Sequence, residues 1–349
     1  MAVLKYENFI PQNIAPKTTK RIGIYNSRGV KVGQFDLQNL AFPTSESKQY
    51  SFGSISDVHL QYNTALEDFQ KALVFLHDTE KVDFTCVCGD LTDNGEVADL
   101  TQYKNAVGNY TVYEITGNHD GYTVGASIEQ QIESYTGEPL YYSFTKGNDV
   151  FIMVGIVDEG RHFTDDELQW LYETLEANRN KRCFVFQHIF PSYGTTPTCG
   201  NAYGIYNNHC WNPANSGQWV YKPAHDVFEN LMKHYKNVVF FHGHSHLEFA
   251  LQSKDCQYAN YSEADGYKSV HIPALSITRT GDSTGSVSRV DIASGSQGYV
   301  VDVYKNGIHL RGRDFAKGEF LPIASYWLDT TLQTIEANTF TDSTGTITT

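Results

Sequence analysis

Five short apolar runs in this chain each end in polar residues of one restricted kind, and this pattern limits the folds open to it. The runs are SFGSIS at 51–56, VDFTCVC at 82–88, YTVYEIT at 110–116, RCFVFQ at 182–187 and NVVFF at 237–241. Runs of this length are typical of buried strands, and helical patterns near 64–78 and 95–106 separate the first three. The alternation predicts a layered α/β domain.

Aspartate, asparagine and histidine follow all five runs. They are, in chain order, Asp57 and His59; Asp90 and Asp93; Asn118, His119 and Asp120; His188; and His242, His244 and His246. Ligands of layered α/β folds bind at the carboxyl ends of the strands, and each of these sets is expected at such an end. A single histidine there is easily a packing residue, but core packing does not explain five coincident sets.

The spacing within the sets favours a metal site. Residues two apart in an extended segment point to the same side, so Asp57 and His59 are placed to converge on one ion, and His244 and His246 to project together. Three of the sets contain a glycine that lets the backbone approach the site closely. Imidazole with carboxylate suits Zn, Fe, Mn or Co, and the chain has no cysteine cluster of the kind that holds a structural zinc.

Read as motifs, the five sets resemble those of a known family. SDVHL, CGDLTDNG, TGNHDG, FQHIF and HGHSH stand in the same order as in the calcineurin-like metallophosphoesterases, which include purple acid phosphatases and many phosphodiesterases. The resemblance extends over roughly residues 50 to 320. It implies an α/β fold of the four-layer α/β/β/α sandwich type. It also implies a site with two metal ions, divalent or of mixed valence, drawn from Mn, Fe and Zn.

The resemblance implies a role for each residue as well. One ion would be bound by Asp57, His59, Asp90 and His246, and the other by Asp90, Asn118, His188 and His244. Asp90 would bridge the two ions, and a hydroxide between them would attack the phosphorus of an ester. His119 would stabilise the transition state or protonate the leaving oxygen, with Asp93 or Asp120 supporting it.

The same motifs favour a phosphodiesterase, with a small-molecule phosphomonoesterase as the alternative. Protein Ser/Thr phosphatases of the family carry an arginine where Asn94 follows Asp93 here, and GNHE where this chain has GNHD. The formal net charge of −14 makes long nucleic acid an unfavourable partner, because an acidic surface repels phosphate backbones. The expected substrate is therefore a small-molecule or polymer phosphoester.

Three segments are expected along the chain. Residues 1–47 form an N-terminal extension with a hairpin about 26–29, loosely similar to attachment segments of phage tail proteins. A virion or surface structural protein that carries the enzyme domain as a module is therefore an alternative of another class. Residues 48–330 form the metallophosphoesterase domain, with a long substrate-side loop at 189–219. Residues 331–349 form a Thr-rich tail that is either loose or an added edge strand.

The sequence also bears on the compartment and on a few single residues. No apolar run is long enough to span a bilayer and the N-terminus has no signal-peptide stretch, so a cytoplasmic location is expected, with virion association or release as alternatives. Cys199 and Cys210 flank the middle of the long loop and either pair or stay as thiols. His242 is expected to be a half-buried histidine at a strand end rather than a ligand.

Overall fold

The fold is taken from a computed structural model of the chain. It describes residues 21–25, 31–36, 47–62, 64–121, 128–156, 163–189, 222–249, 261–262, 266–280, 290–291 and 295–349. Most of the predicted loop at 189–219, with Cys199 and Cys210, lies outside the described residues. The segment boundaries after residues 47 and 330 stay predictions.

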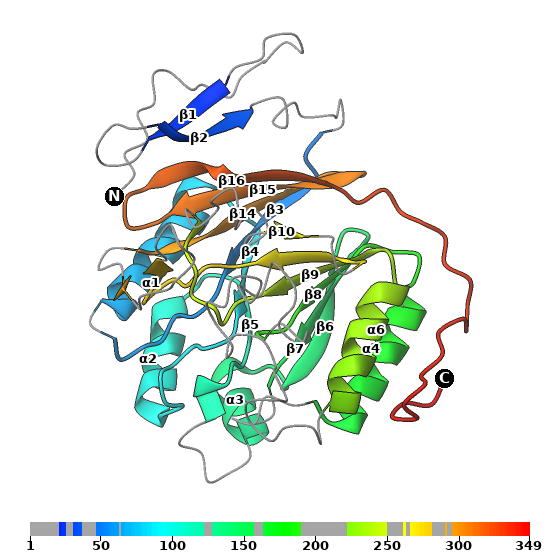
Figure 1. Cartoon of the computed structure of the whole chain (residues 1–349). Helices are drawn as coiled ribbons and strands as arrows, with labels where there is room; N and C mark the ends of the chain where they lie inside the picture. The colour runs from blue at the N-terminus through cyan, green and yellow to red at the C-terminus, as the bar shows by residue number, and fades with distance from the viewer. Residues whose placement is uncertain are drawn as a thin grey trace.

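Two six-stranded sheets form the body of the domain (Figure 1). The first has the order β16-β15-β14-β3-β4-β5 and the second β10-β11-β9-β8-β7-β6. The first sheet consists of β3 (Tyr50–Ile55), β4 (Phe84–Cys88), β5 (Val112–Ile115), β14 (Gln297–Val303), β15 (Gly307–Asp314) and β16 (Glu319–Asp329). The second consists of β6 (Tyr141–Lys146), β7 (Asp149–Val154), β8 (Cys183–Phe186), β9 (Val238–His242), β10 (Tyr261–Ser262) and β11 (Lys268–His271).

Within each sheet a block of parallel strands carries the expected apolar runs. Strands β3, β4 and β5 are parallel, as are β7, β8, β9 and β11. The other pairings in these two sheets are antiparallel, and β14 joins β3 in that sense. Because parallel strands end at the same edge, residues that follow β3, β4, β5, β8 and β9 are brought to one side of the molecule.

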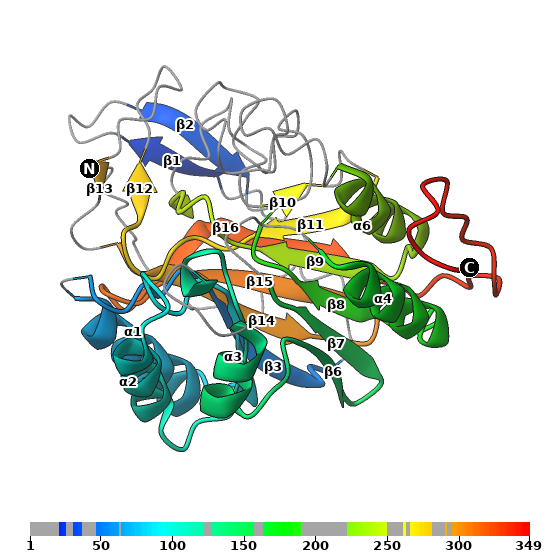
Figure 2. The ribbon, with the colours of Figure 1, turned by 90° about the horizontal axis from the view of Figure 1, so that it is seen from below.

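Helices cover the outer face of each sheet (Figures 1 and 2). On the first sheet lie α1 (Ala65–Val74), the π-helical turn η2 (Phe75–Thr79), α2 (Val97–Val107) and α3 (Ile128–Thr136). On the second lie α4 (Asp165–Ala177) and α6 (Lys222–His234). A third hydrophobic cluster fills the space between the sheets. The molecule therefore has four layers, which confirms the predicted α/β/β/α sandwich.

The packing explains why the strand sequences are apolar on both faces. In β7 the side chains of Phe151 and Met153 lie between the sheets, whereas those of Ile152 and Val154 pack beneath α4 and α6. Phe52 of β3 meets Phe151 across the inner layer with ring centroids 5.2 Å apart. A strand that is covered on both sides has no face that needs polar residues.

Helix α4 begins with a side-chain cap. The Thr164 side chain accepts a hydrogen bond from the Glu167 backbone N–H at 3.1 Å, which caps the first turn. Leu168, Leu171 and Leu175 are all buried on the face that meets the second sheet. The cap and this apolar face together stabilise α4.

The C-terminal tail differs from the expectation. After β16 ends, residues 330–349 form no further strand; they run beside α4 and α6. Phe340 and Ile347 are buried in the cluster beneath those helices, and the Arg179 side chain donates a hydrogen bond to the Ile335 carbonyl at 3.1 Å. The prediction of a loose tail or an edge strand is wrong, because two isolated apolar side chains give no periodic signal in a Thr-rich segment.

A short hairpin precedes the domain. Strand β1 (Arg21–Tyr25) pairs antiparallel with β2 (Lys31–Asp36), which confirms the two strands predicted about residues 26–29. These strands form a two-stranded sheet of their own. The attachment role suggested for residues 1–47 stays a prediction.

A buried ion pair joins the two sheets at the edge opposite the predicted site. Arg182, which precedes β8, donates from Nη2 to Asp149 Oδ2 at 2.6 Å and from Nε to Asp149 Oδ1 at 3.1 Å. The Tyr50 hydroxyl at the start of β3 donates to Asp149 Oδ2 at 2.6 Å. Arg182 also donates to the Tyr304 carbonyl at 2.9 Å and to Thr330 Oγ1 at 2.8 Å. Both sheets are thus tied to one guanidinium.

Replacing Arg182→Ala is expected to lower the free energy of unfolding by about 3–5 kcal/mol, because Asp149 would be left as a buried, unpaired charge. Chemical denaturation measures this loss. Lys71→Ala is the control, since Lys71 pairs with Glu67 on the surface, and it should change stability little. Equal small losses in both variants would contradict a structural role for the buried pair.

Candidate metal centre

The polar sets that follow the strands meet at one place between the two sheets. Asp57 N–H bonds the Gly89 carbonyl at 3.1 Å, which joins the ends of β3 and β4. Gly243 N–H bonds the His188 carbonyl at 3.0 Å, which joins the ends of β9 and β8. His244 N–H then reaches across to Asp57 Oδ2 at 3.1 Å, so that the two sheets are connected at this edge.

Six predicted ligands form two buried groups. In each group, one donor atom per residue lies within 4.8 Å of every other. The groups are Asp57, His59, Asp90 and His246, and Asp90, His188 and His244. All six residues are buried, and Asp90 belongs to both groups. Buried Asp/His clusters that share a carboxylate are consistent with a binuclear metal site.

The distances between facing atoms suit a shared ion. His188 Nε2 lies 3.0 Å from Asp90 Oδ2, and His246 Nε2 lies 3.1 Å from Asp57 Oδ1. His59 Nε2 lies 3.1 Å from His246 Nε2 and 3.5 Å from Asp90 Oδ2. Ligand atoms bound at about 2.0–2.2 Å to one ion are themselves roughly 3–3.5 Å apart. The residues present therefore fit a metal.

The carboxylates of Asp57 and Asp90 each have one oxygen that accepts a backbone hydrogen bond and one that faces the centre of the site. Asp57 Oδ2 accepts the His244 N–H, and Asp90 Oδ1 accepts the His119 N–H at 2.9 Å. The other oxygens, Asp57 Oδ1 and Asp90 Oδ2, are buried and accept no hydrogen bond of good geometry from the described residues. They face the histidine nitrogens, which is the arrangement that cation ligands need.

The histidine rings are held with Nε2 toward the centre. His188 Nδ1 donates to the Cys88 carbonyl at 2.6 Å, and His246 Nδ1 donates to the Ile277 carbonyl at 3.2 Å. Since a carbonyl only accepts, the hydrogen of each neutral ring is on Nδ1 and Nε2 has a lone pair. Metal-ligating histidines commonly have their tautomer fixed in this way.

The backbones of five candidate ligands are strained. Asp57, His59, Asp90, His244 and His246 have φ angles of 54°, 47°, 50°, 69° and 60°, in the left-handed region that residues with a Cβ rarely adopt. Such conformations gather at functional sites, where the surrounding structure maintains them. The strain was not predicted from sequence.

Two of the glycines beside the candidate ligands allow the backbone to approach neighbouring side chains closely. A Cβ added at Gly117 would lie 2.1 Å from Asp90 Oδ1, and one added at Gly243 would lie 1.9 Å from Ser56 Oγ. Either side chain would displace a ligand or the strand end beside it. The expected reason for glycine at these positions is therefore confirmed.

Asn118, His119, Asp93 and Asp120 lie around the two groups. Asn118 is fully buried on the loop after β5, and the adjacent His119 has a side chain that is 29% exposed. His119 Nδ1 donates to the Asp93 carbonyl at 2.8 Å, which leaves Nε2 as the acceptor of the neutral ring. His119 lies beside the metal groups and also forms a looser cluster with His59 and Asp93.

The two supporting aspartates do different things. Asp93 Oδ1 lies 3.2 Å from His59 Nδ1, and that hydrogen bond lowers the pKa of Asp93. Asp120 accepts from Gly117 N–H at 2.8 Å and Thr92 N–H at 2.9 Å, which ties together the loops after β4 and β5. Burial, with the Asp90 charge, raises the pKa of Asp120 to about 6. Asp120 is therefore placed to position the loops.

A family model for calcineurin-like phosphoesterases matches residues 50–248, which is more than half of the chain. The chain belongs to the calcineurin-like phosphoesterase family. No curated protein matches its sequence. In the described part of this family member, no helix is long and apolar enough to cross a membrane.

Solved structures resemble this calcineurin-like phosphoesterase in fold. One is GAP50 of Plasmodium, described as the anchor in the inner membrane complex, with 12% identity and a TM-score of 0.52 over 86% of this chain and 92% of that one. A conserved uncharacterized protein of Streptococcus pneumoniae, a predicted phosphoesterase, has 10% identity and a TM-score of 0.37 over 80% and 97%. Vacuolar protein sorting 29 of Cryptosporidium parvum has 13% identity and a TM-score of 0.37 over 81% and 100%. The GAP50 match supports the fold.

Charge is balanced within the site of this phosphoesterase family member. Burial alone would raise the pKa of Asp57, but His246 and His188 outweigh it and hold that pKa well below its usual range. Asp90 is likewise held low, against burial, by His188 and His59. Burial lowers the pKa of His188, but Asp90 and Asp57 raise it to about 9. Without metal, histidine protons therefore offset the buried carboxylates.

Two further histidines lie behind the ligand loop of β9. His242 is fully buried rather than half-buried, and it belongs to neither metal group among the described residues. Burial and the nearby His271 hold its pKa well below the usual value. The sequence motifs do not include His271; its Nε2 contacts Oγ of Ser245, which stands between the candidate ligands His244 and His246. The signal available was its place at the end of a strand-like run.

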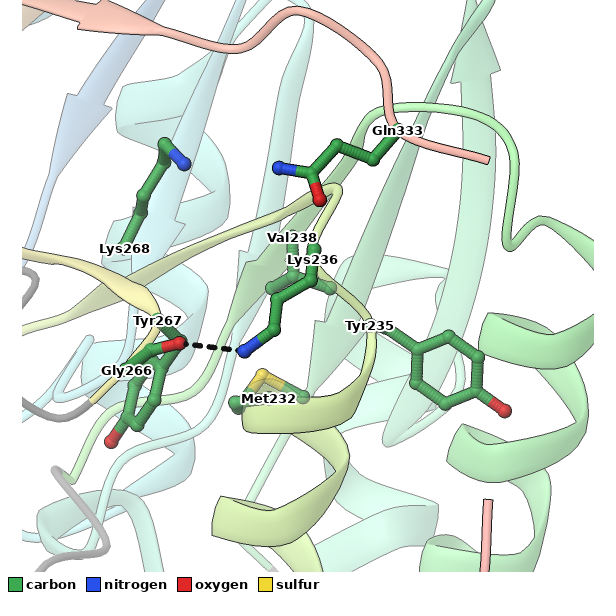
Figure 3. Close-up of a pocket in the computed structure, with 8 residues that line it drawn as sticks. All are labelled: Met232, Tyr235, Lys236, Val238, Gly266, Tyr267, Lys268 and Gln333. Atoms are coloured by element: carbon green, nitrogen blue, oxygen red, sulfur yellow. Dashed lines mark hydrogen bonds between the residues drawn. The ribbon is translucent and has the colours of Figure 1, made fainter. Parts of the chain in front are cut away.

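A separate pocket of 210 Å³ lies at the opposite ends of the strands (Figure 3). Its lining residues are Met232, Tyr235, Lys236, Val238, Gly266, Tyr267, Lys268 and Gln333. None of these belongs to the sequence motifs, and Lys236 donates to the Gly266 carbonyl at 3.1 Å across the pocket. The metal centre is therefore identified by its converging donor atoms rather than by a cavity.

The metal-free protein is expected to lose stability as the pH rises. The folded pKa of His188, about 9, exceeds its ordinary value of 6.5, so its stabilising pairing is complete below 6.5 and is lost as the pH passes through 9. Thermal melting in the presence of a chelator measures this. His188→Gln should flatten the profile between these values; an unchanged slope in that variant would contradict the assignment.

Proposed function

We propose that this protein is a metal-dependent hydrolase of phosphate esters with a preference for phosphodiesters. The observation that supports it most is the position of Asp90. Its carboxylate is fully buried and belongs to both groups of candidate ligands. The two ions would be Mn, Fe or Zn, which accept imidazole and carboxylate ligands. Family membership supports the phosphoester as the substrate class.

The chain's own residues would hold the ions in the way the resemblance implies. Asp57, His59 and His246 would bind one ion, and His188, His244 and Asn118 the other, with Asp90 between them. When bound, the ions supply positive charge for the phosphate and lower the pKa of bound water. The Nδ1 hydrogen bonds of His188 and His246 to backbone carbonyls keep Nε2 of each ring directed at the centre before any ion arrives.

His119 is the residue proposed to act on the leaving group. It is the most exposed histidine of the cluster, and its Nδ1 bond to the Asp93 carbonyl turns Nε2 away from Asp93. A ring held in this way presents Nε2 for proton transfer to a leaving group. Asp93 contacts His119 Nδ1 through its carbonyl at 2.8 Å, with its Oδ1 3.5 Å from the same nitrogen, and therefore orients the ring.

The preference for a diester rests on charge. In the described part of the chain, the ion pairs of Asp57, Asp90 and Asp93 run to histidines, and none runs to lysine or arginine. Asn94, at the position where protein phosphatases of the family carry arginine, donates instead to Gln61 Oε1 at 2.8 Å. Among the described residues no guanidinium is paired with these carboxylates, and such a setting suits the single charge of a diester better than the double charge of a monoester.

Asp90→Asn is expected to abolish both ester hydrolysis and loading of two ions, because the amide removes the shared negative charge. Elemental analysis of the purified protein and hydrolysis of a chromogenic ester with added Mn or Zn measure the two effects. Asp302→Asn is the matched control, since Asp302 is also buried and ion-paired but binds Arg311 on the first sheet. Hydrolysis by Asp90→Asn at the parent rate would contradict the proposal.

The same preparations distinguish the substrate class. A bis-aryl phosphodiester should be hydrolysed with a higher kcat/KM than the corresponding aryl phosphomonoester. The reverse ranking would favour the small-molecule phosphomonoesterase. Hydrolysis of neither, in protein that contains two ions, would leave metal binding without the proposed esterase activity.

A structural or surface protein that carries the enzyme domain as a module is the second candidate. It is supported by the hairpin β1–β2, which pairs within itself and joins neither six-stranded sheet. Deleting residues 1–47 should leave the unfolding midpoint and ester hydrolysis unchanged while abolishing assembly. If the truncated chain does not fold, the segment belongs to the domain and the modular alternative fails.

A further inference from the structure

The loop that follows β9 contains two ligands whose backbones are strained. His244 and His246 have φ angles of 69° and 60°, a left-handed conformation that is strained for a residue with a Cβ. Ser245 N–H bonds the Gly243 carbonyl at 2.9 Å, which tightens the turn. The loop therefore needs a restraint that keeps both imidazoles directed at the centre.

Ser245 supplies a hydrogen-bonded link from this loop to the sheet. Its hydroxyl accepts from the Leu247 N–H at 3.3 Å and lies 2.5 Å from His271 Nε2. The hydroxyl thus links the Leu247 backbone to the His271 ring through two hydrogen bonds. Ser245 and His271 are 2% and 0% exposed, so water does not compete for this bond.

His271 stands on a rigid base. It is the last residue of β11, in register with His242 of the parallel strand β9, and the next residue, Ile272, donates its N–H to the His242 carbonyl at 2.7 Å. Strand β9 lies within the second sheet's parallel block, and β11 is the last strand of that block, paired on its other side with β10. A side chain fixed to a sheet can hold a loop more accurately than another loop can.

We propose that His271 is a positioning residue that, through Ser245, holds His244 and His246 in their ligand geometry. The proposal rests on the metal centre described above, but it does not depend on which ester is hydrolysed. It assigns no contact between His271 and an ion or substrate. Partners of this kind commonly contribute about 10- to 100-fold to metal affinity.

The test is titration of Mn²⁺ into metal-free full-length protein, followed by calorimetry. Ser245→Ala and His271→Ala should each weaken binding by about 10- to 100-fold. The double variant should be no weaker than the poorer single variant, because both changes remove the same bond. His271→Gln, whose side-chain amide is able both to donate to Ser245 and to accept from it, should recover part of the loss.

His309→Ala is the matched control. His309 is also buried, and its Nε2 lies 2.8 Å from Ser325 Oγ, but this pair joins β15 to β16 away from the ligands. Its loss should lower the thermal midpoint without changing Mn²⁺ affinity. If His271→Ala fails to fold, the comparison of Ser245→Ala with His309→Ala decides the matter.

The proposal would be overturned if His271→Ala or Ser245→Ala bound Mn²⁺ as tightly as the parent protein. It would also be overturned if His309→Ala lost as much Mn²⁺ affinity as these variants. The readout separates it from the proposed function. If the parent hydrolyses no ester but His271→Ala still binds Mn²⁺ more weakly, the positioning role stands and the esterase activity fails.

Discussion

The structure depends on two carboxylates that are buried together. Asp57 and Asp90 have no exposed surface, and each disfavours the ionised form of the other unless positive charge lies nearby. Histidines from four strand ends surround them, and a pair of cations would replace the histidine protons when metal binds. The histidine tautomers, the glycines and the strained loops all follow from the need to bring that positive charge close.

The two ends of the sandwich have different tasks. At one edge Arg182 and Asp149 join the sheets through a structural ion pair that faces no ligand group. At the other edge the sheets are joined by the ligand loops themselves, as the bond from His244 N–H to Asp57 shows. Metal binding would therefore be coupled to sheet packing at one edge, whereas the Arg182–Asp149 pair holds the opposite edge without any metal.

Much of this centre could be predicted from the sequence, because its residues follow short apolar runs and strand direction fixes where such residues meet. The sequence predicted in this way that Asp57 and Asp90 lie in one cluster. The left-handed backbone at His244 was not, since a φ angle has no signature in residue type. The bond between Ser245 and His271 joins residues distant in sequence. The buried Phe340 lacked any periodic neighbours, so the docking of the tail was also unpredictable.

Anomalous diffraction from crystals grown with Mn²⁺ would test the binuclear centre most directly. Two peaks about 3.5–4 Å apart are expected, with the Asp90 carboxylate between them, one beside Asp57 and His246 and the other beside His188 and His244. No peak at Asp90, or a single peak outside these two groups, would contradict a centre built on the shared carboxylate.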